Sequence, residues 1–325
     1  MSSIYLYHWS ELDNLRHKKI NSLIKKEIVT SDFIGFISLY VTGKCHLKCS
    51  HCHAEEDFGL EEDVPLEDLI TILTKLRGLT NRIQLTGGEI MMRRDSISKK
   101  NDILLLVDVA NQLNFDIILS TTGMQIKNSM LPILKERNVS WFSLSLDGHD
   151  PKTNSLIRNN DLSWEKTIEL IPKLKKEGFN VKVGTVITQI NSNLINLRKI
   201  GNILHSLNVD VWKLTQFFPR EVGRASSKNE NKLKISNETF NSISEKIHDE
   251  FYDKFKTLTF QPISDFSSAP AFLVSPLGNI SVTINTSDKY LGNILIDKID
   301  KIKNNIININ AQKTMKKNEL GTYTI

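Results

Sequence analysis

The only three cysteines of this 325-residue chain are Cys45, Cys49 and Cys52, all within one short stretch. Their spacing, three and then two intervening residues, lets three thiolates converge on one iron–sulfur cubane and leaves its fourth iron without a protein ligand. An iron of that kind can bind a small molecule. Three cysteines this close together, with none elsewhere, cannot form a disulfide framework. They are typical of a metal or cluster site in a reducing compartment.

A zinc site is the alternative, because Cys₃His is an ordinary zinc ligand set and His46, His51 and His53 lie in the same stretch. Zinc motifs usually present paired ligands from two separate segments, and the sequence has no second cluster of cysteine and histidine. The sequence therefore favours a cluster, with a non-enzymatic zinc-binding protein as the alternative. His51, directly before the third cysteine, is the histidine best placed to lie flat against a bound ring.

Further polar motifs follow segments that read as strands. Gly87, Gly88 and Glu89 come directly after residues 82–86, and two glycines bring backbone close to a ligand while an acidic residue pairs with an ammonium group. Ser145 and Asp147 belong to the Ser-Leu-Asp-Gly run at the end of the stretch 141–146.

The elements that must position these residues alternate between short β-branched or aromatic runs and longer segments of helical period. Leucine and isoleucine stripes recur at three and four residues in 66–76 and 194–204, and a further helix is expected after Ser236. This pattern predicts an α/β fold with a parallel sheet, a partial (β/α)6 TIM-like barrel whose chemistry lies at the carboxyl ends of the strands. The six predicted strands are 36–41, 82–86, 116–120, 141–146, 180–187 and 209–216.

Three regions are predicted along the chain. Residues 1–35 read as an N-terminal helical cap and residues 36–257 as the barrel. In residues 258–325 the pattern changes: the runs 271–275 and 279–284 flank a Pro-Leu-Gly-Asn turn, which is a hairpin signal, and a helix and tail rich in lysine and asparagine follow. This last region is predicted to be a C-terminal extension that holds no cluster cysteine.

Composition places the chain among ordinary folded proteins, with 24% charged and 40% hydrophobic residues. No apolar run is long enough to span a bilayer and the N-terminus lacks the pattern of a signal peptide, so we expect a cytoplasmic protein without a membrane partner. The net charge of +5 is spread over many lysines and arginines. We interpret these as solvated helix faces, and the alternative is a docking surface for an acidic partner. Nucleic acid is not favoured.

In these motifs the chain resembles the radical SAM superfamily, over roughly residues 36–225. Its CxxxCxxC loop is matched by the three cysteines, its GGE motif by residues 87–89 and its SLDG pattern by residues 145–148, while Thr122 stands where the family's TNG segment usually has asparagine. The resemblance implies three contacts to S-adenosylmethionine. Glu89 would bind its amino group, and Arg158 would bind its carboxylate, a task that suits a guanidinium. The strand ends near Ile187 and Phe217 would contact its adenine. By the same resemblance Gly87, Gly88, His51, Thr122, Ser145 and Asp147 belong to the cofactor site.

The resemblance also implies a mechanism. A reduced [4Fe-4S] cluster held by the cysteines would cleave S-adenosylmethionine to a 5′-deoxyadenosyl radical, which abstracts a hydrogen atom from substrate. The expected cofactors are the cluster and S-adenosylmethionine, and the expected partners are an electron donor such as flavodoxin or ferredoxin and a peptide or small-molecule substrate. The three catalytic thiols would be the metal ligands.

The absence of further cysteines narrows the reaction. The tail resembles a cluster-free remnant of the SPASM/twitch-like extensions, and no second cluster can be held by cysteine. This favours a redox-neutral rearrangement, elimination, coupling or epimerisation. The substrate is expected to be a peptide or natural-product precursor, which a separate leader-binding protein would deliver; the alternative is a small metabolite such as a sugar or nucleotide, as in viperin-like enzymes.

Overall fold

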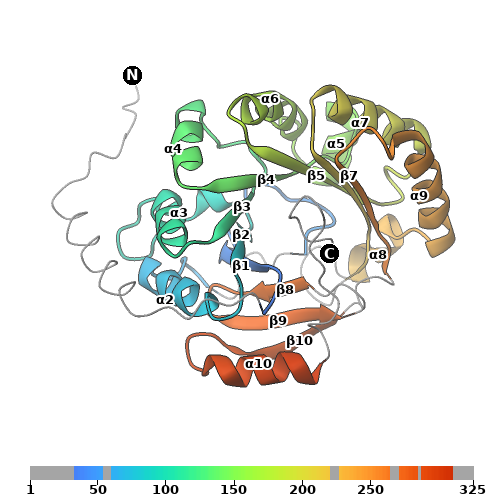
Figure 1. Ribbon diagram of the computed structural model, residues 1–325. Coiled ribbons are helices and arrows are strands. Elements are labelled where there is room, and N and C mark those ends of the chain that lie inside the picture. The colour runs from blue at the N-terminus through green and yellow to red at the C-terminus, as the bar shows by residue number, and fades with distance from the viewer. Residues whose placement is uncertain (1–32, 54–59, 220–226, 264–270, 285–286, 310–325) are drawn as a thin grey trace.

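The computed structural model describes residues 33–53, 60–219, 227–263, 271–284 and 287–309. In these residues one ten-stranded sheet curves round on itself, and helices cover its outer side (Figure 1). The predicted N-terminal cap lies outside the described residues, apart from its last three positions. No helix in the described part of the chain is both long and apolar enough to cross a membrane.

Seven consecutive strands of the sheet are parallel, and their order follows the chain. The six predicted strands are all present, and the sheet does not close, so the open partial barrel is confirmed. A seventh parallel strand begins at residue 257, where the barrel was predicted to end, so the parallel part of the sheet continues beyond that boundary. The strands are β1 (Ile37–Thr42), β2 (Arg82–Gly87), β3 (Asp116–Ser120), β4 (Val139–Ser145), β5 (Asn180–Ile187), β6 (Val211–Gln216) and β7 (Thr257–Gln261).

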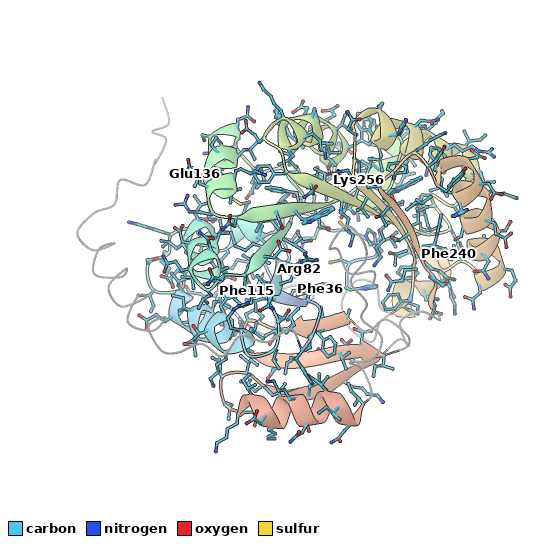
Figure 2. All side chains as sticks on the ribbon, viewed as in Figure 1. Phe36, Arg82, Phe115, Glu136, Phe240 and Lys256 are labelled. Atoms are coloured by element: carbon cyan, nitrogen blue, oxygen red, sulfur yellow. The ribbon has the colours of Figure 1, made fainter. Side chains whose placement is uncertain are left out.

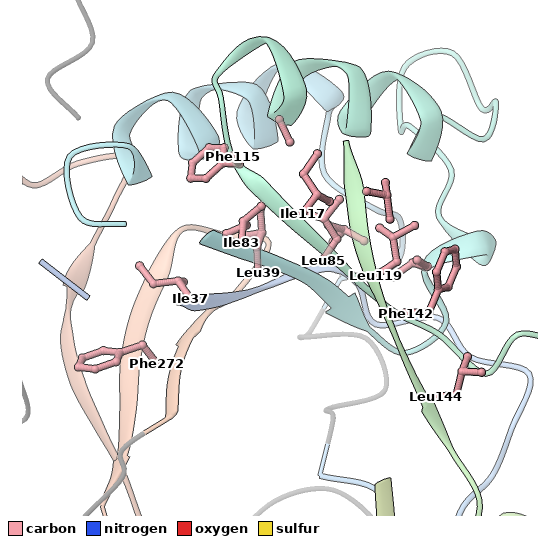
Figure 3. Close-up of a cluster of buried hydrophobic side chains, with 14 of the residues drawn as sticks. Ile37, Leu39, Ile83, Leu85, Phe115, Ile117, Leu119, Phe142, Leu144 and Phe272 are labelled. Carbon is pink, nitrogen blue, oxygen red and sulfur yellow. The ribbon is translucent and has the colours of Figure 1, made fainter. Parts of the chain in front are cut away.

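The outer helices pack their apolar stripes on the convex face of the sheet. Figure 3 shows this core, in which alternate residues of the first four strands, Ile37, Leu39, Ile83 and Leu85 among them, are almost fully buried. The side chains fill the layer between sheet and helices, where Phe240 is buried on α9 (Figure 2). The helices are α2 (Leu66–Leu76), α3 (Ile103–Gln112), α4 (Leu131–Glu136), α5 (Pro151–Arg158), α6 (Ser163–Lys176), α7 (Leu194–Ser206), α8 (Ser227–Leu233) and α9 (Asn237–Phe251), with short 3-10 turns η1 (Ile90–Met92) and η2 (Asn128–Met130).

The C-terminal residues extend the barrel sheet at its other edge. The predicted hairpin is present as β8 (Ala271–Val274) and β9 (Asn279–Ile284), and β8 pairs with β1 in parallel, with Ser38 opposite Leu273. β10 (Ser287–Asn293), which the sequence did not predict, pairs with β9, and α10 (Ile299–Asn308) covers this end (Figure 1). The first barrel strand is therefore an interior strand of the full sheet.

The two faces of each barrel strand differ in polarity. In β5 the side chains of Val181, Val183 and Thr185 are fully buried, whereas Lys182 and Gly184 between them are partly exposed. Successive residues of a strand point to opposite faces, and the helices cover the buried set, so the second set faces the concave side, or lumen, of the barrel. The lumen is therefore lined by polar and small residues.

Candidate active site

The cysteine loop follows β1 and is fixed against α5. Cys49 is buried and its thiol lies 3.7 Å from the carbonyl oxygen of Arg158, while the neighbouring Ser50 N–H donates to the carbonyl of Ile157 at 2.8 Å. Cys45 accepts a hydrogen bond from the Leu47 N–H at 3.3 Å. None of the three cysteines forms a disulfide. The loop thus holds three reduced thiols on one side of the lumen.

The electrostatics of Cys45 suit a cationic centre. Burial raises the pKa of this thiol to about 11, the Leu47 N–H opposes the rise, and the nearby Cys49, Glu89 and Cys52 add to it. Cys45 therefore lies where a bare thiolate is disfavoured and a thiolate bound to iron is favoured. Among the described residues no group of three or more Cys, His, Asp or Glu side chains is arranged to hold a single metal ion. A cubane presents several irons, so its ligands need not converge on one point as zinc ligands do.

Two glycines at the end of β2 hold this loop in place. Gly88 N–H donates to the carbonyl of Thr42 at 2.9 Å, and Glu89 N–H donates to the carbonyl of Lys44 at 2.8 Å. A Cβ on Gly87 would lie 2.2 Å from the Thr42 oxygen, and one on Gly88 would lie 2.3 Å from the Lys44 oxygen. The sequence predicts that these glycines bring backbone close to a ligand. In the structure they also allow the backbone of the cysteine loop to approach β2.

Glu89 is fully buried at the start of η1, and its carboxylate is held by two threonines. One oxygen accepts from the hydroxyl of Thr121 at 2.6 Å and from the Met91 N–H at 3.1 Å. The other accepts from the backbone N–H and the hydroxyl of Thr122, at 2.7 and 2.6 Å. Thr122, where the family usually has asparagine, thus orients the acid of the GGE motif.

Asp147 and Arg158 form a buried ion pair. The Arg158 Nε lies 2.8 Å from Asp147 Oδ2, and Asp147 Oδ1 accepts from the Val186 N–H at 2.8 Å. Burial lowers the pKa of Arg158, but the Asp147 carboxylate, together with smaller contributions from Cys49 and Cys52, more than offsets this and the pKa is raised. His51 Nε2 is 3.7 Å from the same carboxylate oxygen. Arg158 and His51 line the cavity with Asp147 behind them, so Asp147 is a positioning residue for both.

Asp147→Asn is expected to destabilise the protein strongly, because it keeps the shape of the side chain but leaves the buried guanidinium of Arg158 without its counter-charge. Breaking such a pair from one side costs about 3–5 kcal/mol. Urea denaturation measures the change in the free energy of unfolding. The matched control is Glu250→Gln, which breaks the exposed pair with Arg198 and should cost less than about 1 kcal/mol. Equal losses in the two variants would contradict the role given to Asp147.

One cavity of about 430 Å³ joins these features. Of the predicted site residues, the three cysteines, His51, Gly87, Gly88, Thr122, Ser145, Arg158 and Phe217 line it. Ile187 is fully buried in the core, and its carbonyl accepts the Phe217 N–H at 3.0 Å. Sequence reasoning missed the deeper lining, which comes from alternate residues of the strands: Tyr40, Gln84, Lys213, Thr215, Gln261, Ala271, Leu273 and Thr283.

Comparison with known families identifies the domain that carries this cavity. Residues 39–193, from β1 to the loop after β5, match the family model described as the radical SAM superfamily. Residues 39–193 are a radical SAM domain. Enzymes of that family use a [4Fe-4S] cluster and S-adenosylmethionine.

Individual relatives of the radical SAM domain act on different substrates. The chain is 23% identical over 197 residues to an S-adenosylmethionine-dependent nucleotide dehydratase of Fibrobacter sp., a match over 56% of this chain and 55% of the relative. It is 27% identical over 158 residues to the GTP 3′,8-cyclase of Aquifex aeolicus, over 46% of this chain and 47% of the relative. The chain thus spans about half the length of these curated relatives.

A solved structure shares the fold over nearly the whole chain. The crystal structure of Streptococcus suis SuiB bound to S-adenosylmethionine is 17% identical in sequence and has a TM-score of 0.62. The alignment covers 92% of this chain and 72% of the SuiB chain. SuiB has also been crystallised with its precursor peptide SuiA. The aligned share is larger than residues 36–257 alone, so the fold likeness extends beyond the predicted barrel.

The residues present fit the cofactors of the radical SAM domain. The loop after β1 offers three reduced thiols beside one cavity, and a glycine pair fixes that loop on β2. Arg158, held by Asp147, offers a cation on the same cavity, and the cavity-lining Thr121 and Thr122 hold the fully buried carboxylate of Glu89 next to it. These groups complement the carboxylate and the ammonium of an amino acid.

Proposed function

We propose that the chain is a radical SAM enzyme with a single cluster, held by Cys45, Cys49 and Cys52, that removes a hydrogen atom from a substrate bound in the barrel lumen. The observation that carries the proposal is the shared cavity, in which the three thiols face the same space as the lumen residues of β6 and β8. When bound, the cluster and S-adenosylmethionine supply the reductive carbon–sulfur cleavage that generates the hydrogen-abstracting species.

The protein's own part is binding, orientation and exclusion of water. Arg158 would pair with the methionyl carboxylate of the cofactor and Glu89 with its ammonium. The two side chains carry opposite charges, and each is held in place, Arg158 by Asp147 and Glu89 by two threonines. The curved sheet and the C-terminal strands wall the lumen on the sides that they cover, which would limit the access of water to the reacting atoms.

Reconstituted protein is expected to convert S-adenosylmethionine to 5′-deoxyadenosine and methionine when dithionite is added under anaerobic conditions. Liquid chromatography with mass spectrometry measures both products, and a sample without dithionite is the control. The same protein should be brown, with iron and sulfide each at about four per chain. A colourless protein that holds one zinc and forms no 5′-deoxyadenosine would end this proposal.

The substrate proposed for this site is a peptide or natural-product precursor, and the alternative is a small metabolite. A peptide or natural-product precursor is supported by the fold likeness to SuiB, which has been crystallised with a precursor peptide. A small metabolite is supported by the curated relatives named for nucleotides and for GTP. In both cases the single cluster favours a redox-neutral rearrangement, elimination, coupling or epimerisation, with an external flavodoxin or ferredoxin as the electron donor.

A further inference from the structure

One glutamine on the lumen has a buried hydrogen-bond donor without an acceptor. Gln261 is the last residue of β7, is only 3% exposed, and lines the cavity that contains the cysteine loop. Among the described residues, no group accepts a hydrogen bond from its side-chain Nε2. A buried amide N–H that makes no hydrogen bond costs free energy, so an unpaired one in a folded protein calls for a reason. Its place on the cavity makes a bound ligand the acceptor that best explains it.

The neighbouring glutamine has the opposite arrangement. Gln216 is the last residue of β6 and lines the same cavity, but both polar atoms of its side chain are bonded to the protein. Its Nε2 donates to Asn237 Oδ1 at 3.0 Å and to the Ile235 carbonyl at 3.3 Å, and its Oε1 accepts from the Ile263 N–H at 3.0 Å. The last contact fixes the backbone directly beyond β7. Gln261 therefore lies on a well-anchored strand end, with a donor that no described residue uses.

The pairing of β6 with β7 places a hydroxyl beside this amide. Thr215 is opposite Gln261 in the parallel register, and both residues line the cavity, so both side chains lie on the lumen face. A carboxamide carries a donor and an acceptor in one plane, and a hydroxyl can act as either. Together they match a planar amide of a ligand, which offers a carbonyl oxygen and an N–H.

We infer that Gln261 and Thr215 bind a planar amide group of the substrate, which is a backbone amide of a peptide or the lactam of a nucleobase. The inference rests on the proposed function, since it places the substrate in the cavity of the radical SAM domain. Both residues lie at the carboxyl ends of their strands, and the cysteine loop follows the carboxyl end of β1 on the same cavity. Gln261 thus determines specificity, because a buried site built to hydrogen-bond a group rejects analogues that lack it.

The test follows the side-chain amide of Gln261 by NMR in the full-length protein, loaded with its cluster and S-adenosylmethionine and without reductant. The chain has seven glutamines, so ¹⁵N-glutamine labelling gives few Nε2 signals, and the signal that Gln261→Met loses belongs to Gln261. Two probes are titrated separately: N-acetylglycine N-methylamide, which carries peptide amides, and guanosine, which carries a lactam. At least one probe should shift the Gln261 signal saturably, whereas the signal of Gln112, exposed at the end of α3, should not move. The probe that acts distinguishes the two sources of the amide.

Two variants measure the contribution of each side chain to binding. Gln261→Met keeps the length of the side chain and removes the amide, and Thr215→Val keeps the shape and removes the hydroxyl. Each should raise the dissociation constant of the responding probe by at least about fivefold, measured by saturation transfer to the probe. The control variant Gln112→Met should leave this constant unchanged.

A second measurement needs no ligand. In the absence of probe, Gln261→Met should raise the urea midpoint of unfolding, because it removes an amide that has no acceptor. Gln216→Met should lower the midpoint, because it leaves the Ile263 N–H and the Ile235 carbonyl without their partner. If Gln261→Met lowers the midpoint as Gln216→Met does, or if neither probe moves the Gln261 signal, the inference is wrong.

Binding of the probes is independent of cofactor cleavage. A response of Gln261 in a protein that forms no 5′-deoxyadenosine with dithionite would leave the amide subsite in place and contradict the proposed function. Formation of 5′-deoxyadenosine without a response of Gln261 would do the reverse.

Discussion

Cys49→Ala is expected to lose the cluster and all S-adenosylmethionine cleavage. Cys49 is the buried member of the three thiols, and with one ligand removed the loop can no longer hold the cluster through three thiolates. Iron content should fall from about four per chain to near zero. Formation of 5′-deoxyadenosine should fall to the level of a sample without enzyme. Iron assays and product analysis after anaerobic reconstitution measure these losses.

The matched control for this variant is Lys48→Ala, which changes the exposed neighbour in the same loop. It should keep its iron and its cleavage of S-adenosylmethionine. Circular dichroism should show an unchanged fold in both variants, because the cysteine side chain contributes little packing. If Cys49→Ala still forms 5′-deoxyadenosine, the assignment of the cluster ligands is wrong.

Gly88→Ala is expected to lose most of its iron although no ligand is changed. The added methyl group would lie 2.3 Å from the Lys44 carbonyl oxygen, so the backbone of the cysteine loop must move away from β2. Overpacking of this kind costs about 1–3 kcal/mol. If this cost destabilises the position of the cysteine loop against β2, the affinity of the loop for the cluster falls by about tenfold or more. Iron per chain after gel filtration measures the loss.

Gly184→Ala is the control, since it adds the same methyl group to a strand of the same sheet, where the nearest atom of the described residues is the Leu144 carbonyl oxygen at 3.8 Å. It should keep a wild-type iron content. Unfolding midpoints separate loss of the loop position from loss of the whole fold: Gly88→Ala should lower the midpoint modestly and the iron content severely. A Gly88→Ala protein that holds wild-type iron would show that the glycine does not position the loop.

Much of the barrel could be predicted because its signals are local. Strands such as β2 alternate between apolar and polar residues and α2 carries an apolar stripe, because the apolar side chains of sheet and helix are buried against each other. The start of the helix after Ser236 is marked by this serine, whose side chain accepts a hydrogen bond from the Thr239 N–H. The cysteine spacing is equally local. These features depend on residues a few positions apart, which a sequence displays directly.

The parts that escaped prediction depend on distant partners. β10 is mostly polar and is a strand because β9 offers it a partner, and β7 follows the helix that was expected to end the barrel. The pairing of β8 with β1 joins segments from opposite parts of the chain. Strand pairing of this kind is decided by tertiary context, which local propensity does not report.

The site shows the same division. The motif residues were found by their spacing, but their contacts were not: Asp147 faces Arg158 and Val186, and Thr122 faces Glu89. Lys213 left a signal that could have been used. In Val211–Gln216 the polar Lys213 and Thr215 alternate with the apolar Trp212 and Leu214, and this alternation indicates a polar inner face.

The parallel pairing of β8 with β1 bears on when the protein can mature. During synthesis β1 emerges early, and until residues 271–274 follow, it has no neighbour on that side and remains an exposed edge. The cysteine loop thus follows a strand that gains its second neighbour only after residues 271–274 have been synthesised. A nascent chain stalled before β8 would present its thiols on an incomplete sheet.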